Sequence, residues 1–194
     1  MRKLKIIENI SLDGVIQHTD DNDNFPCVDW NAPYRSPEGR DELFAACGGG
    51  SFDVLLGRRA YDILSGFWPK APAGPMADAL NAGKKYVVTH RPESLEWGPF
   101  EGLGPDLVKD VRRIKSQDGP DLIVWGSSTL TSTLLEHGLA DEVSLSVNPV
   151  LLGVGKRFFA EGTPPRSFEL VSAKAMPTGI IFSTYKVAGP LKGA

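Results

Sequence analysis

Residues 121–135, DLIVWGSSTLTSTLL, change from an apolar run to small hydroxylated residues and then to a helical pattern. The apolar run 122–125 is typical of a strand buried on both faces, and Gly126 permits a sharp turn after it. Leu130, Leu134 and Leu135 recur at helical spacing, which places the N–H groups of a helix start at the carboxyl end of a strand. Phosphates bind at such positions, so the turn is a candidate pyrophosphate site. An ordinary capped helix after a core strand explains the same residues.

Length and charge limit the class of protein. A chain of 194 residues accommodates one α/β domain, and we expect a single domain over residues 1–194. The net charge is −3, and the basic residues are scattered apart from Arg58–Arg59 and Arg112–Arg113. A protein that binds a nucleic-acid backbone needs a basic patch, so we expect no DNA or RNA partner.

The apolar segments and the cysteines exclude further classes. No apolar run reaches the length of a membrane span or of a signal peptide, so we expect a cytoplasmic protein without a membrane partner. Cys27 and Cys47 lie far apart, and His18, His90 and His137 have no metal-ligand spacing. We therefore expect reduced thiols and no bound metal.

Strand and helix patterns alternate along most of the chain. The pattern predicts strands at residues 4–10, 52–56, 85–89, 122–125 and 142–147, and a closing pair of strands at 168–172 and 180–187. Helices are predicted at 36–46, from 57 onward, at 77–81, at 106–116 and after 127, with an irregular excursion at 65–75. This order favours a mostly parallel sheet with an antiparallel edge.

Residues 17–24 contain five aspartates and asparagines and little that packs, so we expect a mobile surface loop. The loop is interpreted either as a lid beside an active site or as a solvated connector. Phe25, Trp30 and Tyr34 follow it, and these rings either plug the core or line a pocket for a flat heterocycle.

Cationic residues occupy two further turns. Arg58 and Arg59 stand in the first turn of a predicted helix, where they oppose the helix dipole and call for a nearby anion. Thr89, His90 and Arg91 end a predicted strand, where they can bind an adenosine 2′-phosphate or form a simple strand exit.

Five segments together resemble the dihydrofolate-reductase-like family, in particular the C-terminal domain of the riboflavin-biosynthesis reductases and its stand-alone relatives. They are SLDG at 11–14, LLGRRAY at 55–61, KKYVVTH at 84–90, VWGSSTL at 124–130 and LLEHGLADEVSLSVNPVLLGVGKRFF at 134–159. The resemblance implies a three-layer α/β fold with a mixed, mostly parallel central sheet of about eight strands flanked by helices, and a bound NADPH.

The resemblance also implies roles for particular residues. Three groups correspond to family positions that meet the cofactor phosphates, the adenosine and the pyrophosphate: Gly57, Arg58 and Arg59; Thr89, His90 and Arg91; and Gly126, Ser127, Ser128, Thr129 and Leu130. Asn9 and Ile16 correspond to positions whose main chain reaches the nicotinamide carboxamide.

The chain departs from the family at one of these turns. Many relatives have Gly-Gly there, often preceded by glutamate, whereas this chain has Trp125-Gly126-Ser127. The departure leaves open whether the riboflavin-pathway reaction and an unusual backbone geometry are retained.

Asp41 is the candidate catalytic residue. A gapless count back from Gly57 places it where folate reductases carry their pocket acid. A carboxylate half-buried among Trp30 and Phe44 would anchor or protonate a pterin-like ring. The alternative is an exposed acid in the early turns of a helix.

We therefore expect an NADPH-dependent reductase that transfers hydride to a small heterocycle, either pterin-like or ribosylamino-pyrimidine-like, as 5-amino-6-(5-phosphoribosylamino)uracil reductase does. The alternatives are dihydrofolate reductase activity and a nucleotide-binding protein without turnover. We also expect a homodimer, because relatives commonly pair and one domain is not expected to cover the apolar residues 143–150 fully.

Overall fold

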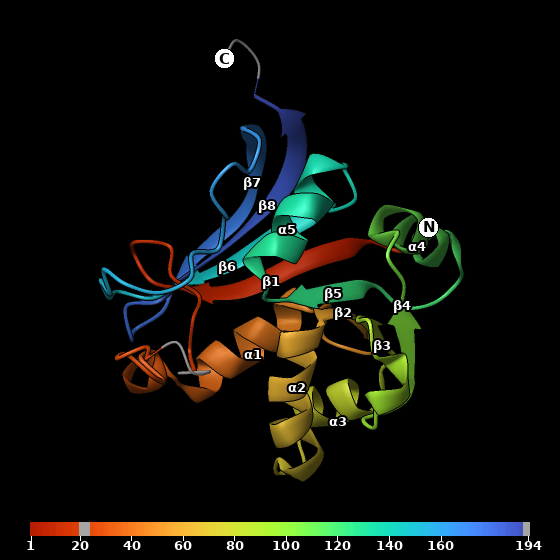
Figure 1. The fold of residues 1–194 in the computed structure, drawn as a ribbon. Helices are drawn as coiled ribbons and strands as arrows, with labels where there is room; N and C mark the ends of the chain where they lie inside the picture. The colour runs from red at the N-terminus through yellow and green to blue at the C-terminus, as the bar shows by residue number, and fades with distance from the viewer. Residues whose placement is uncertain (20–23, 192–194) are drawn as a thin grey trace.

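An eight-stranded sheet runs through the computed structural model, which describes residues 1–19 and 24–191 (Figure 1). In chain order the strands are β1 (Leu4–Ile10), β2 (Asp53–Gly57), β3 (Lys85–Val88), β4 (Phe100–Leu103), β5 (Leu122–Trp125), β6 (Glu142–Val147), β7 (Arg166–Ala175) and β8 (Ile181–Pro190). Their order in the sheet is β4-β3-β2-β5-β1-β6-β8-β7. Neighbours from β4 to β6 are parallel, and β8 and β7 are antiparallel. The expected mostly parallel sheet with an antiparallel edge is confirmed.

Helices cover both faces of the sheet (Figure 1). The helices α1 (Pro37–Ala46), α2 (Arg58–Phe67) and α3 (Pro75–Ala82) lie on one face, and α4 (Leu107–Ser116) and α5 (Ser128–Glu136) lie on the other. Short 3₁₀ turns occupy Ala32–Tyr34, Trp68–Lys70 and Pro92–Ser94. None of the helices in the described ranges is long and apolar enough to cross a membrane.

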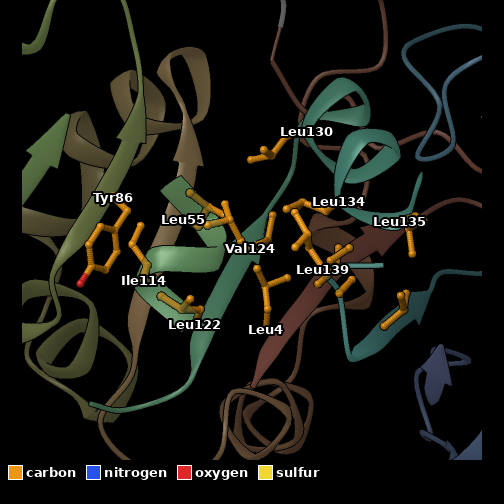
Figure 2. Close-up of a cluster of buried hydrophobic side chains, with 14 of the residues drawn as sticks. Leu4, Leu55, Tyr86, Ile114, Leu122, Val124, Leu130, Leu134, Leu135 and Leu139 are labelled. Atoms are coloured by element: carbon orange, nitrogen blue, oxygen red, sulfur yellow. The ribbon is translucent and has the colours of Figure 1, made fainter. Parts of the chain in front are cut away.

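Side chains alternate between the two faces of the central strands and form one hydrophobic core on each face. Leu4 and Ile6 of β1 join the cluster under α4 and α5, which Figure 2 shows, whereas Ile7 joins the cluster under α1, α2 and α3. The same division holds for Val124 and Ile123 of β5, so both faces of that strand are buried. A continuous apolar run is what such a strand requires.

The structure differs from the expected elements in two places. The excursion at 65–75 is helical as far as Lys70, because α2 continues to Phe67 and a 3₁₀ turn follows. The edge strand β4 was not expected at all. Residues 143–150 are covered only in part, as expected: β6 lies between β1 and β8 and Val143 is 1% exposed, whereas Leu145, Val147 and Val150 are partly buried and Pro149 is exposed.

Exposed apolar side chains occur at several places, and three of them lie on the closing hairpin. Leu170 and Val171 of β7 and Ile181 of β8 are 61%, 63% and 48% exposed. Figure 1 shows β7 and β8 at one end of the sheet, beyond α5. The edge hairpin therefore carries exposed apolar side chains of its own.

The SLDG segment shapes the connection after β1. The Ser11 hydroxyl donates to Asp13 Oδ1 at 2.6 Å, and this bond holds the pKa of the Asp13 carboxyl down, to about 2. Asp13 also accepts the N–H groups of Leu152 and Gly153 at 3.2 and 2.9 Å. The carboxylate thereby ties the loop after β1 to the segment after β6.

The aromatic residues after this loop form a small core of their own. Phe25 and Trp30 are buried with Val15, and Trp30 Nε1 donates to the Gln17 carbonyl at 2.7 Å. Residues 20–23 of the expected mobile loop lie outside the described residues. Phe25 and Trp30 therefore plug a core, and they do not line the main pocket described below.

Candidate functional site

A pocket of about 540 Å³ opens at the carboxyl ends of β1, β5 and β2, which are neighbours in the sheet. Such an edge is where ligands of open α/β sheets bind. Eight of the lining residues were expected from sequence: Ile16, Gly57, Arg58, Arg59, Gly126, Ser127, Ser128 and Thr129. The others are Glu8, Gln17, His18, Thr19, Ala60, Ile63, Leu64, Trp125 and Lys156.

Two helices begin at this pocket. Gly57 precedes α2 and Ser127 precedes α5, and both cap residues are part of the lining. The first N–H groups of a helix have no partner within the helix, and the helix dipole places partial positive charge there. The pocket therefore brings two helix starts together with the cationic side chains Arg58, Arg59 and Lys156, an arrangement that suits a ligand with phosphate groups.

The turn before α5 has an unusual backbone. Gly126 has φ +67° and Ser127 has φ +72°, so two consecutive residues lie in the region that favours glycine. The unusual geometry is thus present although serine replaces the second glycine of the relatives, at a cost of roughly 1–3 kcal/mol. A Cβ atom on Gly126 would lie 3.3 Å from Glu8 Oε2, a tight contact that would require the Glu8 carboxyl to shift.

Arg58 is held in place at the rim. Its Nε donates to both carboxylate oxygens of Asp62 at 2.8 and 3.1 Å, one helical turn away. Its Nη1 donates to the Ser94 hydroxyl and, at 3.3 Å, to the Arg91 carbonyl. Part of the negative charge expected beside the two arginines is therefore supplied by Asp62 itself.

The remaining residues expected at the cofactor lie beside the pocket or beneath it. Thr89 Oγ1 accepts the Arg91 N–H at 3.0 Å, and the segment from Thr89 to Arg91 reaches the site through Arg58. Leu130 is 5% exposed and belongs to the core under α5. Asn9 lies at the end of β1, and its N–H donates to Glu8 Oε1 at 3.0 Å. None of Thr89, His90, Arg91, Leu130 or Asn9 belongs to the described lining of the pocket.

Asp41 does not occupy the expected environment. It is an exposed residue of α1 and does not belong to the described lining of the pocket. The partly buried residues of α1 that pack against the core are Leu43, Phe44 and Ala46. The expectation of a half-buried carboxylate at position 41 is wrong.

The carboxyl group that is buried at this site is Glu8. It is 5% exposed at the carboxyl end of β1, and it accepts N–H groups from Asn9 and Gly126. Burial raises the pKa of Glu8 to about 8, and the two N–H groups offset only part of that shift. Sequence reasoning treated Glu8 as a polar break in the strand. The signal that could have identified it is its phase, because Leu4, Ile6 and Glu8 share the face under α5.

Uncharged side chains make up much of the remaining lining of the pocket. The His18 ring stacks on Trp30 with centroids 4.6 Å apart and planes 14° apart. Burial lowers the pKa of His18 to about 4, so the ring is neutral at pH 7. Ile63, Leu64 and Trp125 add apolar surface, and Trp125 stands where riboflavin-pathway relatives often have glutamate.

No three His, Cys, Asp or Glu side chains in the described ranges are grouped as a metal site requires. The polar features of the pocket are its two helix starts, its cations and the buried Glu8.

Comparison with known proteins gives both a family and a fold. The family model of the RibD C-terminal domain matches residues 2–182. The uncharacterized Bacillus subtilis protein YyaP is 25% identical over 136 residues, which cover 68% of this chain and 72% of YyaP. The uncharacterized protein YwjB of the same organism is 24% identical over 175 residues, which cover 89% of this chain and 91% of YwjB.

Two solved structures share the architecture. A putative riboflavin biosynthesis protein from a Shewanella species superposes with a TM-score of 0.71 at 18% identity, over 95% of this chain and 98% of that one. A pyrimidine reductase-like protein from Corynebacterium diphtheriae superposes with a TM-score of 0.63 at 14% identity, over 96% and 92%. The expected dihydrofolate-reductase-like α/β fold is confirmed.

Proposed function

The chain belongs to the RibD C-terminal domain family, and on that premise we propose that it is an NADPH-dependent reductase of a small heterocycle. The observation that carries the proposal is the meeting of two helix starts, three cationic side chains and a glycine turn in one pocket at the carboxyl ends of β1, β5 and β2. That combination fits the diphosphate of a dinucleotide.

The residues present fit the cofactor part by part. The Gly126–Ser127 turn and the start of α5 would hold the pyrophosphate, because both line the pocket and the first N–H groups of a helix favour anions. Arg58 and Arg59 would pair with the phosphates, and Arg58 is already oriented by Asp62 and Ser94. The main chain near Ile16 would meet the nicotinamide, since Ile16 lines the same pocket. Bound NADPH would supply a hydride.

The apolar lining residues support a substrate with a flat ring, and a C=N or C=O bond of that ring would accept the hydride. Ile63, Leu64 and Trp125 would exclude water and pack against a ring, and the neutral His18 ring would extend that surface. With Trp125 in place of glutamate, the protein would hold the ring by packing at this position and not by a charged hydrogen bond. We propose a pterin-like or ribosylamino-pyrimidine-like substrate.

The test is the consumption of NADPH when dihydrofolate, dihydropterins and aminopyrimidines are added in turn. We expect one class of these compounds to be reduced with loss of the NADPH absorbance. Turnover of dihydrofolate alone would identify the dihydrofolate reductase alternative. Binding of NADPH without consumption by any compound would favour a nucleotide-binding protein without turnover, and absence of NADPH binding would contradict the proposal.

We further propose a homodimer, because Leu170, Val171 and Ile181 are exposed on the edge hairpin β7–β8. Apolar side chains exposed at a sheet edge would be covered by a contact between copies.

A further inference from the structure

The buried Glu8 carboxyl shares one turn with the anion site proposed above. Its Oε1 accepts the Asn9 N–H at 3.0 Å, and the carboxyl also accepts the N–H of Gly126. Gly126 is so close that an added Cβ would lie 3.3 Å from Glu8 Oε2. The peptide after Gly126 leads directly into the start of α5, which faces the pocket. The carboxyl group and a bound phosphate would therefore meet the same short piece of backbone.

Charged groups around Glu8 are distributed unevenly. On the packed elements β5, β6 and α5, the acids Asp121, Glu142 and Glu136 lie at or beyond the ends remote from Glu8. The titratable or charged side chains that share the pocket with Glu8 are His18, Arg58, Arg59 and Lys156, and Arg157 follows, within 3.9 Å of Asp13. The cations that would attract a phosphate line the same pocket as Glu8, and Glu8 itself is 5% exposed.

We propose that Glu8 takes up one proton when an anionic dinucleotide binds, so that a neutral carboxyl supports the Gly126–Ser127 turn in the complex. The inference rests on the proposed function, because it requires a dinucleotide diphosphate in this pocket. Glu8 is then a positioning residue, which holds the turn and removes its own charge as the ligand arrives.

The physical reason is repulsion between like charges in a site of low dielectric constant. An ionised carboxylate and a diphosphate at the same turn would repel each other. Because Glu8 is 5% exposed, water screens this repulsion poorly. Protonation requires little additional driving force, since burial has already raised the pKa of Glu8 to about 8. Binding of the anion raises that pKa further, and the proton comes from the solvent.

The consequence is a defined pH dependence. Below about pH 7 Glu8 is already protonated and contributes no uptake on binding. Above pH 8 the free protein has lost the proton, so binding must restore it. The affinity for the dinucleotide then falls with rising pH, by up to about tenfold per pH unit.

The experiment is calorimetric titration of the full chain with NADPH at pH 8.5 in buffers of different ionisation enthalpy. The adenosine 2′-phosphate is fully ionised at this pH and adds no proton of its own. For wild type we expect uptake of roughly 0.5–0.8 proton per NADPH. Glu8→Gln should show an uptake lower by that amount, with an affinity that no longer falls between pH 8 and 9.5. The matched control Glu136→Gln changes an exposed acid at the far end of α5 and should behave as wild type.

Several outcomes overturn the inference. Equal proton uptake in wild type and Glu8→Gln would do so while leaving the proposed function intact. Failure of wild type to bind NADPH at any pH would remove the proposed function and the inference together. If Glu8→Gln does not fold, infrared difference spectra of wild type at pH 8.5 decide the matter. Binding of NADPH should produce a new protonated-carboxyl band, and its absence would refute the proton uptake.

Discussion

Glu8→Gln is expected to stabilise the folded protein at alkaline pH, because it removes a carboxylate that is buried when ionised. The pKa of Glu8 rises from 4.5 to about 8 on folding, and burial is the largest cause. A shift of this size corresponds to roughly 5 kcal/mol at most, at about 1.4 kcal/mol per pKa unit. The amide group of the glutamine brings N–H donors that need hydrogen-bond partners, and this cost offsets part of the gain in stability. We therefore expect a net gain of roughly 2–4 kcal/mol in the free energy of unfolding at pH 9.

The sign of the effect follows from the direction of the shift. Since the pKa is higher in the folded protein, the contribution of the Glu8 proton to stability is complete below about pH 4.5. It declines as the pH rises and is lost once the pH passes about 8. Glu8→Gln has no proton to lose, so its advantage over wild type should grow between pH 5 and pH 8 and then stay constant.

Urea denaturation of wild type, Glu8→Gln and Glu136→Gln at pH 5, 7 and 9 measures these differences. Glu136→Gln controls for the loss of an acid, because its side chain is exposed. Parallel pH profiles of stability in wild type and Glu8→Gln would refute the assignment of a buried, proton-binding carboxyl at position 8.

Three further changes test other parts of the account. Ser127→Gly should raise the free energy of unfolding by roughly 1 kcal/mol, because Ser127 has φ +72°, and an unchanged midpoint in thermal denaturation would argue against strain there. Asp41→Asn should leave turnover and its pH profile unchanged, because Asp41 is exposed on α1, and a loss of tenfold or more in kcat would restore its catalytic role. Light scattering at micromolar protein should give a dimer mass, and Val171→Glu on the exposed face of β7 should give a monomer mass; a wild-type monomer would contradict the dimer.

The sequence located best those elements whose residues show both a periodic apolar pattern and a capping or turn residue at the boundary. The predicted strand at 4–10 is β1, and the predicted helix at 36–46 is α1, whose cap Ser36 accepts the Gly39 N–H at 3.0 Å. The strand β4 was missed because Phe-Glu-Gly-Leu has neither alternation nor a buried run, and only Leu103 is fully buried. The strand β4 forms because it pairs with the edge strand β3, and a local sequence pattern does not encode such long-range pairing.

The residues of the candidate site show the same difference between local sequence signals and long-range pairing. Turns that carry local signals, at Gly57 and Gly126, were placed correctly at the edge of the sheet. Lys156 could not be placed, because it reaches the pocket through pairing of the Ile16 N–H with its carbonyl at 2.8 Å, across a long stretch of chain. The half-buried environment expected for Asp41 was wrong because a count of residues carries no helical phase.

Calorimetric titration of wild type and of the Arg58→Ala, Arg59→Ala double variant with NADPH tests the central claim most directly. Both side chains line the pocket at the start of α2, where charge-assisted hydrogen bonds to phosphate would form. We predict that wild type binds NADPH more tightly than NADH, and that the double variant loses roughly 2–4 kcal/mol of NADPH binding free energy. Equal affinity of the two proteins for NADPH would contradict the placement of the cofactor phosphates at this edge of the sheet.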